Sequence, residues 1–130
     1  MLRLKSLKLV VTGLVLTALF SSVAVQAKGP DFADTQATIT VAELPRQGAQ
    51  VYGLIPLGGP FAHEKDGVVF GNRERLLPIQ KRGFYHEYTV PTPSSSGRGI
   101  RRIVCGGPAR APDTCYYTAD HYASFRKIVP

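Results

Sequence analysis

The spacing of apolar residues predicts one helix near the start of the folded domain. Between Leu44 and Ile55, apolar side chains recur at three- and four-residue intervals, which places them on one face of an α-helix. Pro45 suits the first turn of this helix, and Pro56, with Gly-Gly-Pro shortly after it, would end it.

The rest of the domain has the pattern of β-strands. Runs of β-branched and aromatic residues are separated by turn signals such as Asp-Gly, and by a loop rich in Pro, Ser and Gly at 91–99. The runs lie at 38–41, 68–70, 83–90, 100–105, 115–119 and 122–129, the last expected to be an edge strand. One helix followed by closely spaced strands predicts an α+β fold, with the helix packed on one face of a twisted antiparallel sheet.

The segment before this domain, residues 1–27, has the pattern of a secretory signal peptide. Three basic residues precede an apolar stretch at 9–25, and Val25-Gln26-Ala27 suits a signal peptidase. An uncleaved membrane anchor is the alternative, but the stretch is short for a span of about 20 residues. We expect cleavage after Ala27, a single domain at 28–130 with a loose arm at 28–37, and a secreted or periplasmic protein without a membrane attachment.

Cleavage would lower the positive charge of the protein. The full chain has 16 Lys and Arg against 9 Asp and Glu, a net charge of +7. The segment that would be removed carries three basic residues and no acid, which leaves 13 against 9 and a net charge of +4. This charge is compatible with a polyanionic ligand but does not identify one.

The two cysteines, Cys105 and Cys115, are expected to pair. Thiols of an exported protein meet an oxidising compartment, and the turn-rich residues between them would let a disulfide join the ends of a hairpin. A closed loop of this length contributes about 3 kcal/mol to stability. A zinc site is the alternative, but two cysteines without a suitably spaced histidine match one poorly.

One carboxylate stands inside a strand-like segment. Glu87 is the middle residue of Phe-Tyr-His-Glu-Tyr-Thr-Val, where a partly buried charge needs a partner. Because side chains alternate along a strand, only one of Arg101 and Arg102 could share its face. An arginine on that face would offset the cost of burial and keep Glu87 ionised.

Three more features complete a candidate site. They are Arg98, the tripeptide Asp120-His121-Tyr122, and Phe-Gly-Asn-Arg-Glu at 70–74. A carboxylate can accept a proton, a guanidinium can hold a phosphate, and a histidine can protonate a leaving oxygen, which suits chemistry on a phosphodiester. The alternative is structural: a cross-strand Glu–Arg pair, a solvated loop histidine and a polar turn.

The chain resembles the secreted guanyl-specific microbial ribonucleases of the barnase-like group, closest to the short actinomycete-type members. The resemblance runs from about Leu44 to Ile128, and several blocks follow the order and spacing of the family. The blocks lie at 58–61, 66–74, 77–78, 83–93, 98–104 and 116–125. So many blocks in one order form a specific signal.

The resemblance implies a role for each catalytic residue. Glu87 matches the general base that takes the 2′-hydroxyl proton, and His121 matches the general acid that protonates the 5′-oxygen. Arg98 and Arg102 match the phosphate-binding arginines, and Tyr122 matches a tyrosine that contacts the phosphate. The implied reaction cuts single-stranded RNA 3′ to guanine, forms a 2′,3′-cyclic phosphate and then hydrolyses it. DNA has no 2′-hydroxyl and should not be cut, and the arginines make a metal or other cofactor unnecessary.

Phe-Gly-Asn-Arg-Glu matches the loop that recognises guanine. The carboxylate of Glu74 can accept hydrogen bonds from the N1 and N2 donors of the base, and the backbone N–H groups of Asn72 and Arg73 can serve its O6. Phe70 or Arg73 can offer a stacking face. Close relatives often carry a polar side chain at the position of Gly71. If that side chain helps to hold the base, this protein should bind guanine with lower affinity.

Several neighbouring residues receive simpler interpretations. His86 points away from Glu87 and should serve packing, while His63 should be exposed and Arg101 should lie on a solvated face. Strand alternation and the family match both favour Arg102 as the partner of Glu87. The disulfide is not expected of the best-known family members and should affect stability more than chemistry.

Two other functions fit the same scaffold. One is a non-catalytic module that binds RNA or another polyanion, and the joint presence of Glu87, Arg102 and His121 argues against it. The other is a secreted antibacterial ribonuclease toxin, which would need an immunity partner. The resemblance also implies a small acidic barstar-like inhibitor, and we expect a monomer that binds single-stranded RNA.

Overall fold

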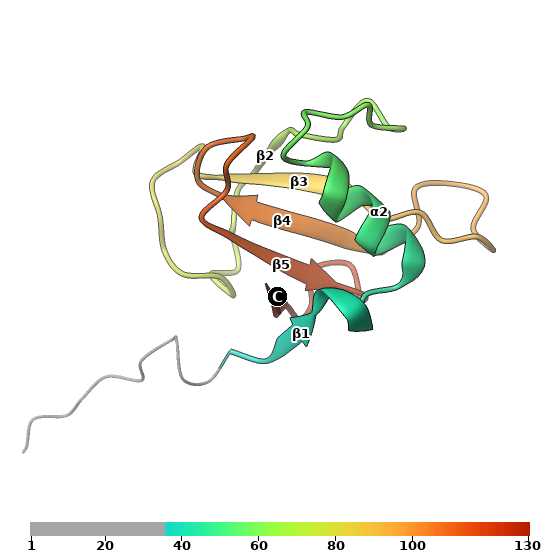
Figure 1. Ribbon diagram of the computed structural model, residues 1–130. Coiled ribbons are helices and arrows are strands. Elements are labelled where there is room, and N and C mark those ends of the chain that lie inside the picture. The colour runs from blue at the N-terminus through green and yellow to red at the C-terminus, as the bar shows by residue number, and fades with distance from the viewer. Residues whose placement is uncertain (1–35) are drawn as a thin grey trace, which may run out of the picture.

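A computed structural model of the protein describes residues 36–130 and shows one helix lying across a β-sheet (Figure 1). The predicted signal peptide and most of the predicted arm lie outside the described residues. The elements are β1 (Thr38–Thr40), the 3₁₀ helix η1 (Val41–Glu43), α2 (Arg46–Leu54), β2 (Val69–Phe70), β3 (Tyr85–Thr89), β4 (Arg102–Gly106), β5 (Thr114–Thr118) and β6 (Arg126–Val129). Within residues 36–130, no helix has the length and apolar character needed to cross a bilayer.

The predicted helix is confirmed as α2. A capping box precedes it: the Thr40 side chain accepts a hydrogen bond from the Glu43 backbone N–H, and the Glu43 carboxylate accepts one from the Thr40 N–H at 2.8 Å. The hydrogen bonds that the Glu43 carboxylate accepts from the Thr40 N–H and from the Thr40 hydroxyl lower the pKa of Glu43. Pro45 stands at the N-cap of α2, and the helix ends at Leu54, before Pro56. Local signals therefore fix both ends of the helix.

The sheet has six strands in the order β1-β6-β5-β4-β3-β2. The strands from β2 to β6 pair antiparallel, as predicted, but β1 pairs parallel with β6, so the sheet is mixed. The prediction of an edge strand near the C-terminus is wrong, because β6 lies between β1 and β5. Ile39 and Ile128 are register partners and both are buried, which explains why β1 covers that edge.

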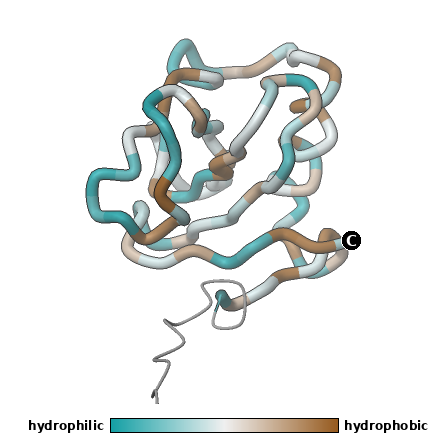
Figure 2. Tube along the Cα trace, turned by 90° about the vertical axis from the view of Figure 1, so that its left-hand side faces the viewer, coloured by the Kyte–Doolittle hydropathy of each residue, from teal (hydrophilic) through white to brown (hydrophobic). Residues whose placement is uncertain are grey.

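The two faces of the sheet pack two separate apolar clusters. Apolar and polar residues follow one another closely along the trace (Figure 2), and in the strands they alternate between faces. The cluster under α2 includes Val51, Tyr88 and Ile103, and the cluster on the other face includes Tyr85 and Val104. Glu87 is the register partner of Val104, so its side chain belongs to the face away from the helix.

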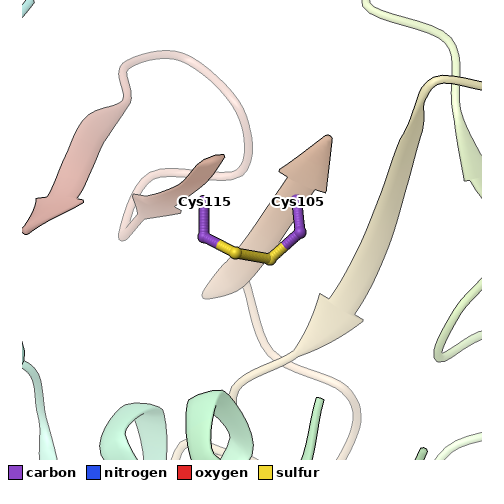
Figure 3. The surroundings of a disulfide bond; sticks show 2 residues. All are labelled: Cys105 and Cys115. Carbon is purple, nitrogen blue, oxygen red and sulfur yellow. A yellow bond between two sulfur atoms is a disulfide. The ribbon is translucent and has the colours of Figure 1, made fainter. Parts of the chain in front are cut away.

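The predicted disulfide is confirmed. Cys105 in β4 and Cys115 in β5 are register partners across the hairpin and are covalently joined (Figure 3). Both cysteines belong to the cluster under the helix. The disulfide therefore lies on the opposite face of the sheet from Glu87.

Candidate active site

A cleft of about 460 Å³ brings the main features of the predicted site together. Its lining includes Glu87, Tyr122 and every residue of 70–74, the segment predicted to bind guanine. The other lining residues were not predicted to belong to the site and are Lys65, Val68, Val69, Leu76 and Phe125. A carboxylate from the central sheet and a loop suited to a base thus share one concave site.

Glu87 is held in this cleft by its backbone and by two side-chain partners. Its N–H donates to Val68 O at 3.0 Å, and its C=O accepts from Gly67 N–H at 2.7 Å. The side chain is 13% exposed; Oε1 accepts a hydrogen bond from Arg98 Nη2 at 3.4 Å, and Oε2 accepts one from Tyr122 Oη at 2.6 Å. The carboxylate is therefore positioned on a rigid strand and reaches solvent through the cleft.

Arg98 is the ion-pair partner of Glu87, so the prediction that Arg102 would fill this role is wrong. The Arg98 guanidinium is fixed by a second contact, because Nε and Nη2 donate to Thr89 Oγ1 at 3.1 and 2.9 Å. Thr89 is buried on the same strand and face as Glu87. Arg98 lies in the loop before β4, so the alternation of side chains along the strands could not predict its position.

Arg101 anchors the preceding loop. Its Nε donates to Thr92 Oγ1 at 3.0 Å, and its Nη2 donates to Pro91 O. The side chain is half-buried. The expectation that Arg101 lies on a solvated face is therefore wrong, because its side chain joins two parts of the loop.

Arg102 is almost completely buried, with 3% exposure, and has an unusual environment for a charged side chain. It is the register partner of Thr89, so it shares the face of Glu87, as alternation predicted. Its Nη1 donates to the carbonyls of Arg101 at 2.8 Å and Gly99 at 3.0 Å, while its buried Nε has no hydrogen-bond partner among the described residues. A buried guanidinium with an unsatisfied donor is suited to hold an anion.

The loop after β5 presents two residues in the left-handed region, His121 at φ 54° and Tyr122 at φ 69°. Such backbone costs about 1–3 kcal/mol per residue and persists only where neighbouring groups enforce it. Here Thr118 Oγ1 donates to Asp120 Oδ1 at 2.8 Å and accepts from Tyr122 N–H at 3.2 Å. Asp120 also accepts from Ser124 Oγ at 2.5 Å and from its N–H at 2.9 Å.

The contacts of this loop shift the pKa values of two of its side chains, Asp120 and Tyr122. Hydrogen bonds from Ser124, and then from Thr118, lower the pKa of Asp120. Burial raises the pKa of Tyr122 to about 12, and the hydrogen bond and negative charge of Glu87 add to the increase, against an opposing effect of Arg102. Tyr122 therefore remains a hydrogen-bond donor at neutral pH.

His121 lies beside Tyr122 at the exposed edge of this group. The two ring centroids are 4.9 Å apart, and the His121 backbone N–H donates to Ile100 O at 3.0 Å. The guanidinium carbon of Arg102 lies 5.9 Å from the centre of the Tyr122 ring. His121, Arg98 and Arg102 do not line the cleft itself, but each contacts Glu87 or Tyr122, which do.

The segment predicted to bind guanine forms a tight loop around Asn72. This residue has φ 48°, and its side chain accepts from Leu77 N–H at 3.1 Å and donates to Leu77 O at 3.0 Å. The Phe70 ring stacks on Tyr122 with centroids 5.1 Å apart. A Cβ on Gly71 would meet only Arg73 atoms, at 3.6 Å or more, so the fold leaves room for a side chain at this position.

The chain is similar to proteins of one known family. The model of a family described as ribonuclease matches residues 27–129. The chain belongs to this ribonuclease family. Guanyl-specific ribonuclease Sa3 from Kitasatospora aureofaciens is 52% identical over 90 residues, which is 69% of this chain and 62% of that protein. The chain thus spans less than two thirds of this relative's length.

Two further members of the ribonuclease family match over nearly their full length. Guanyl-specific ribonuclease Sa from the same organism is 47% identical over 95 residues, covering 73% of this chain and 96% of that protein. A crystal structure of ribonuclease Sa2 with guanosine-2′-cyclophosphate has a TM-score of 0.66 and 43% identity, covering 73% of this chain and 97% of the other. The fold described above is therefore that of the family.

Some residues of this candidate site were not foreseen. Thr118 and Ser124 hold the loop after β5 through Asp120, and their spacing around an aspartate is a signal that sequence reasoning could have used. Four of the five additional cleft residues flank the loop 70–74 in the sequence, and the fifth, Phe125, lies in the segment between β5 and β6. His63 and His86 are both half-buried and neither lines the cleft.

Proposed function

We propose that this protein is an endoribonuclease that cuts single-stranded RNA on the 3′ side of guanine. The observation that carries the proposal is the shared cleft, in which Glu87 and the loop 70–74 line one cavity. The relatives named as guanyl-specific ribonucleases support the choice of base. The structure of Sa2 with a guanosine nucleotide supports the choice of ligand class.

Guanine would bind in the loop 70–74. The exposed carboxylate of Glu74 accepts hydrogen bonds from N1 and N2 of the base, and the backbone N–H groups of Asn72 and Arg73 donate to O6. The side chain of Asn72 is occupied in holding the loop to Leu77, which leaves recognition to the backbone and to Glu74. Adenine presents the opposite pattern of donors and acceptors on this edge and would leave the carboxylate unpaired.

The first chemical step would be a transfer of the phosphorus from one oxygen to another. Glu87 takes the proton of the 2′-hydroxyl, and the 2′-oxygen then forms a bond to phosphorus. The bond from phosphorus to the 5′-oxygen breaks, and His121 protonates that oxygen as it leaves. The products are a 2′,3′-cyclic phosphate and a free 5′-hydroxyl, and water then opens the cyclic phosphate with the two roles exchanged.

The remaining polar groups would stabilise the charge on the phosphate. Arg98 stands beside Glu87 at 3.4 Å, and the buried Nε of Arg102 offers an unused donor. Tyr122, with its raised pKa, can turn its hydroxyl from Glu87 to a phosphate oxygen without losing its proton. These cations and donors would supply the electrostatic stabilisation without a metal or other cofactor.

The setting of the enzyme is part of the same proposal. We expect a secreted or periplasmic monomer that acts after removal of its signal peptide and does not cut DNA. A small acidic inhibitor would fit the cationic site, because it would face the accessible side chains of Arg73 and Arg98.

Dinucleotide cleavage tests the proposal. The mature protein should cut GpA and leave UpA intact in the presence of EDTA. Glu74→Gln should reduce cleavage of GpA by about 5- to 150-fold, the equivalent of 1–3 kcal/mol for a bidentate base contact. Glu64→Gln is the matched control, since Glu64 is an exposed carboxylate outside the cleft lining. Equal cleavage of GpA and UpA, or binding without cleavage, would refute the proposal.

A further inference from the structure

The cleft contains a cation that the proposed reaction does not use. Lys65 lines the same cavity as Glu87 and the loop 70–74, and its side chain is exposed. Among residues 36–130, the ion pair within 4 Å is the one between Arg98 and Glu87, so no carboxylate of this part of the chain pairs with Lys65. An uncompensated cation in a concave site favours an anionic part of the ligand.

The position of Lys65 is fixed by the turn that carries it. Lys65 O accepts a hydrogen bond from Val68 N–H at 3.2 Å, which closes the turn. The turn is then bound to β3 at two places: Gly67 N–H donates to Glu87 O at 2.7 Å, and Thr89 N–H donates to Asp66 Oδ1 at 2.7 Å. Lys65 therefore has a defined place relative to the carboxylate of Glu87.

Lys65 lies on the opposite side of Glu87 from the buried arginine. The strand β3 has β4 on one side and β2 on the other. Arg102 belongs to β4, whereas the turn of Lys65 leads directly into β2. Basic residues therefore flank the strand of Glu87 on both sides, one on β4 and one on the turn before β2.

We infer that Lys65 binds the phosphate on the 5′ side of the guanosine. This inference rests on the proposed function, which assigns the base to the loop 70–74 and the 3′-phosphate to the arginines. With these two directions occupied, the 5′-oxygen is the remaining exit for the chain, and it leaves the ribose on the side away from the 3′-phosphate. The cleft lining holds two cationic side chains, Lys65 and Arg73. Arg73 belongs to the loop that would hold the base, so Lys65 is the cation left for a phosphate on the 5′ side, where it would form a subsite for the upstream chain.

Comparison of GpA with pGpA tests this subsite. The quantity to measure is the ratio of kcat/KM for pGpA to kcat/KM for GpA, because effects common to both substrates cancel in it. In the wild-type protein the ratio should exceed one and should fall at high salt, where an exposed contact is screened. Lys65→Gln should lower the ratio by about two- to fivefold, the effect of one exposed ion contact, and Lys65→Glu should lower it further.

Two controls decide the interpretation. Lys127→Gln makes the same change of charge on β6, which β5 and β4 separate from β3, and it should leave the ratio unchanged. A ratio unaffected by the Lys65 substitutions would overturn the inference, as would a larger decrease in Arg73→Gln, which would place the phosphate at the guanine loop. Failure of the wild-type protein to cut GpA would instead refute the proposed function.

Discussion

The disulfide between Cys105 and Cys115 should stabilise the protein without taking part in its chemistry. The two cysteines are ten residues apart in the sequence. Closing such a loop lowers the conformational entropy of the unfolded chain, which raises its free energy by about 2.7 kcal/mol at 25 °C. For a domain of this size, that free energy corresponds to a decrease of roughly 10–20 °C in Tm upon reduction. Because the disulfide packs under the helix and Glu87 lies on the other face, kcat/KM should not change while the protein is folded.

Urea unfolding of the oxidised and the reduced protein measures this contribution. Reduction breaks the crosslink without removing atoms, so the difference in unfolding free energy reports the crosslink alone. The double variant with Cys105→Ala and Cys115→Ala is the control and should be insensitive to the reductant. Equal unfolding midpoints for the oxidised and reduced wild-type protein would refute the entropic reasoning. A reduced, folded protein with impaired kcat/KM would refute the separation of the two faces.

Three other predictions concern the titration of two tyrosines and the loop after β5. In Glu87→Gln the pKa of Tyr122 should fall from about 12 but stay above 10.0, because burial is its largest cause; absorbance titration, with Tyr122→Phe as reference, measures this. Tyr85 and Tyr122 both have pKa values raised to about 12 in the folded protein. The stability that they contribute is therefore complete below pH 10 and is lost as the pH rises to about 12. The urea concentration at the unfolding midpoint should fall over the same pH range. Thr118→Val should cost about 1–3 kcal/mol of stability and lower kcat/KM, whereas Thr114→Val, which removes a buried hydroxyl without a partner in the described residues, should do neither.

The sequence predicted those parts of the fold that depend on local signals. The helix followed from apolar periodicity and from prolines at both ends, and the strands followed from β-branched runs between turns. Strand order depends on distant contacts, such as the pairing of Ile39 with Ile128, which no local pattern encodes. This is why the parallel pairing of β1 and the interior position of β6 were missed, although the strand at 38–41 was itself predicted.

The candidate site shows the same division. Strand alternation correctly placed Arg102 on the face of Glu87, because the face depends only on position along the strand. The ion pair depends on how the loop before β4 folds back over β3. This loop brings the Arg98 guanidinium to Glu87, where the Thr89 hydroxyl also holds it. The roles given to Glu87 and His121 stay predictions, since they rest on the family resemblance and on the geometry of the cleft.

The most direct test of the account is the rate at which Glu87→Gln cleaves GpA. The substitution keeps the size of the side chain and its ability to accept a hydrogen bond from Tyr122, but it removes the proton acceptor. With the urea midpoint measured in parallel to establish folding, kcat should fall by about 10²–10⁴, the contribution of a positioned general base. A folded Glu87→Gln protein that cleaves GpA at the wild-type rate would contradict the assignment of Glu87 as the base.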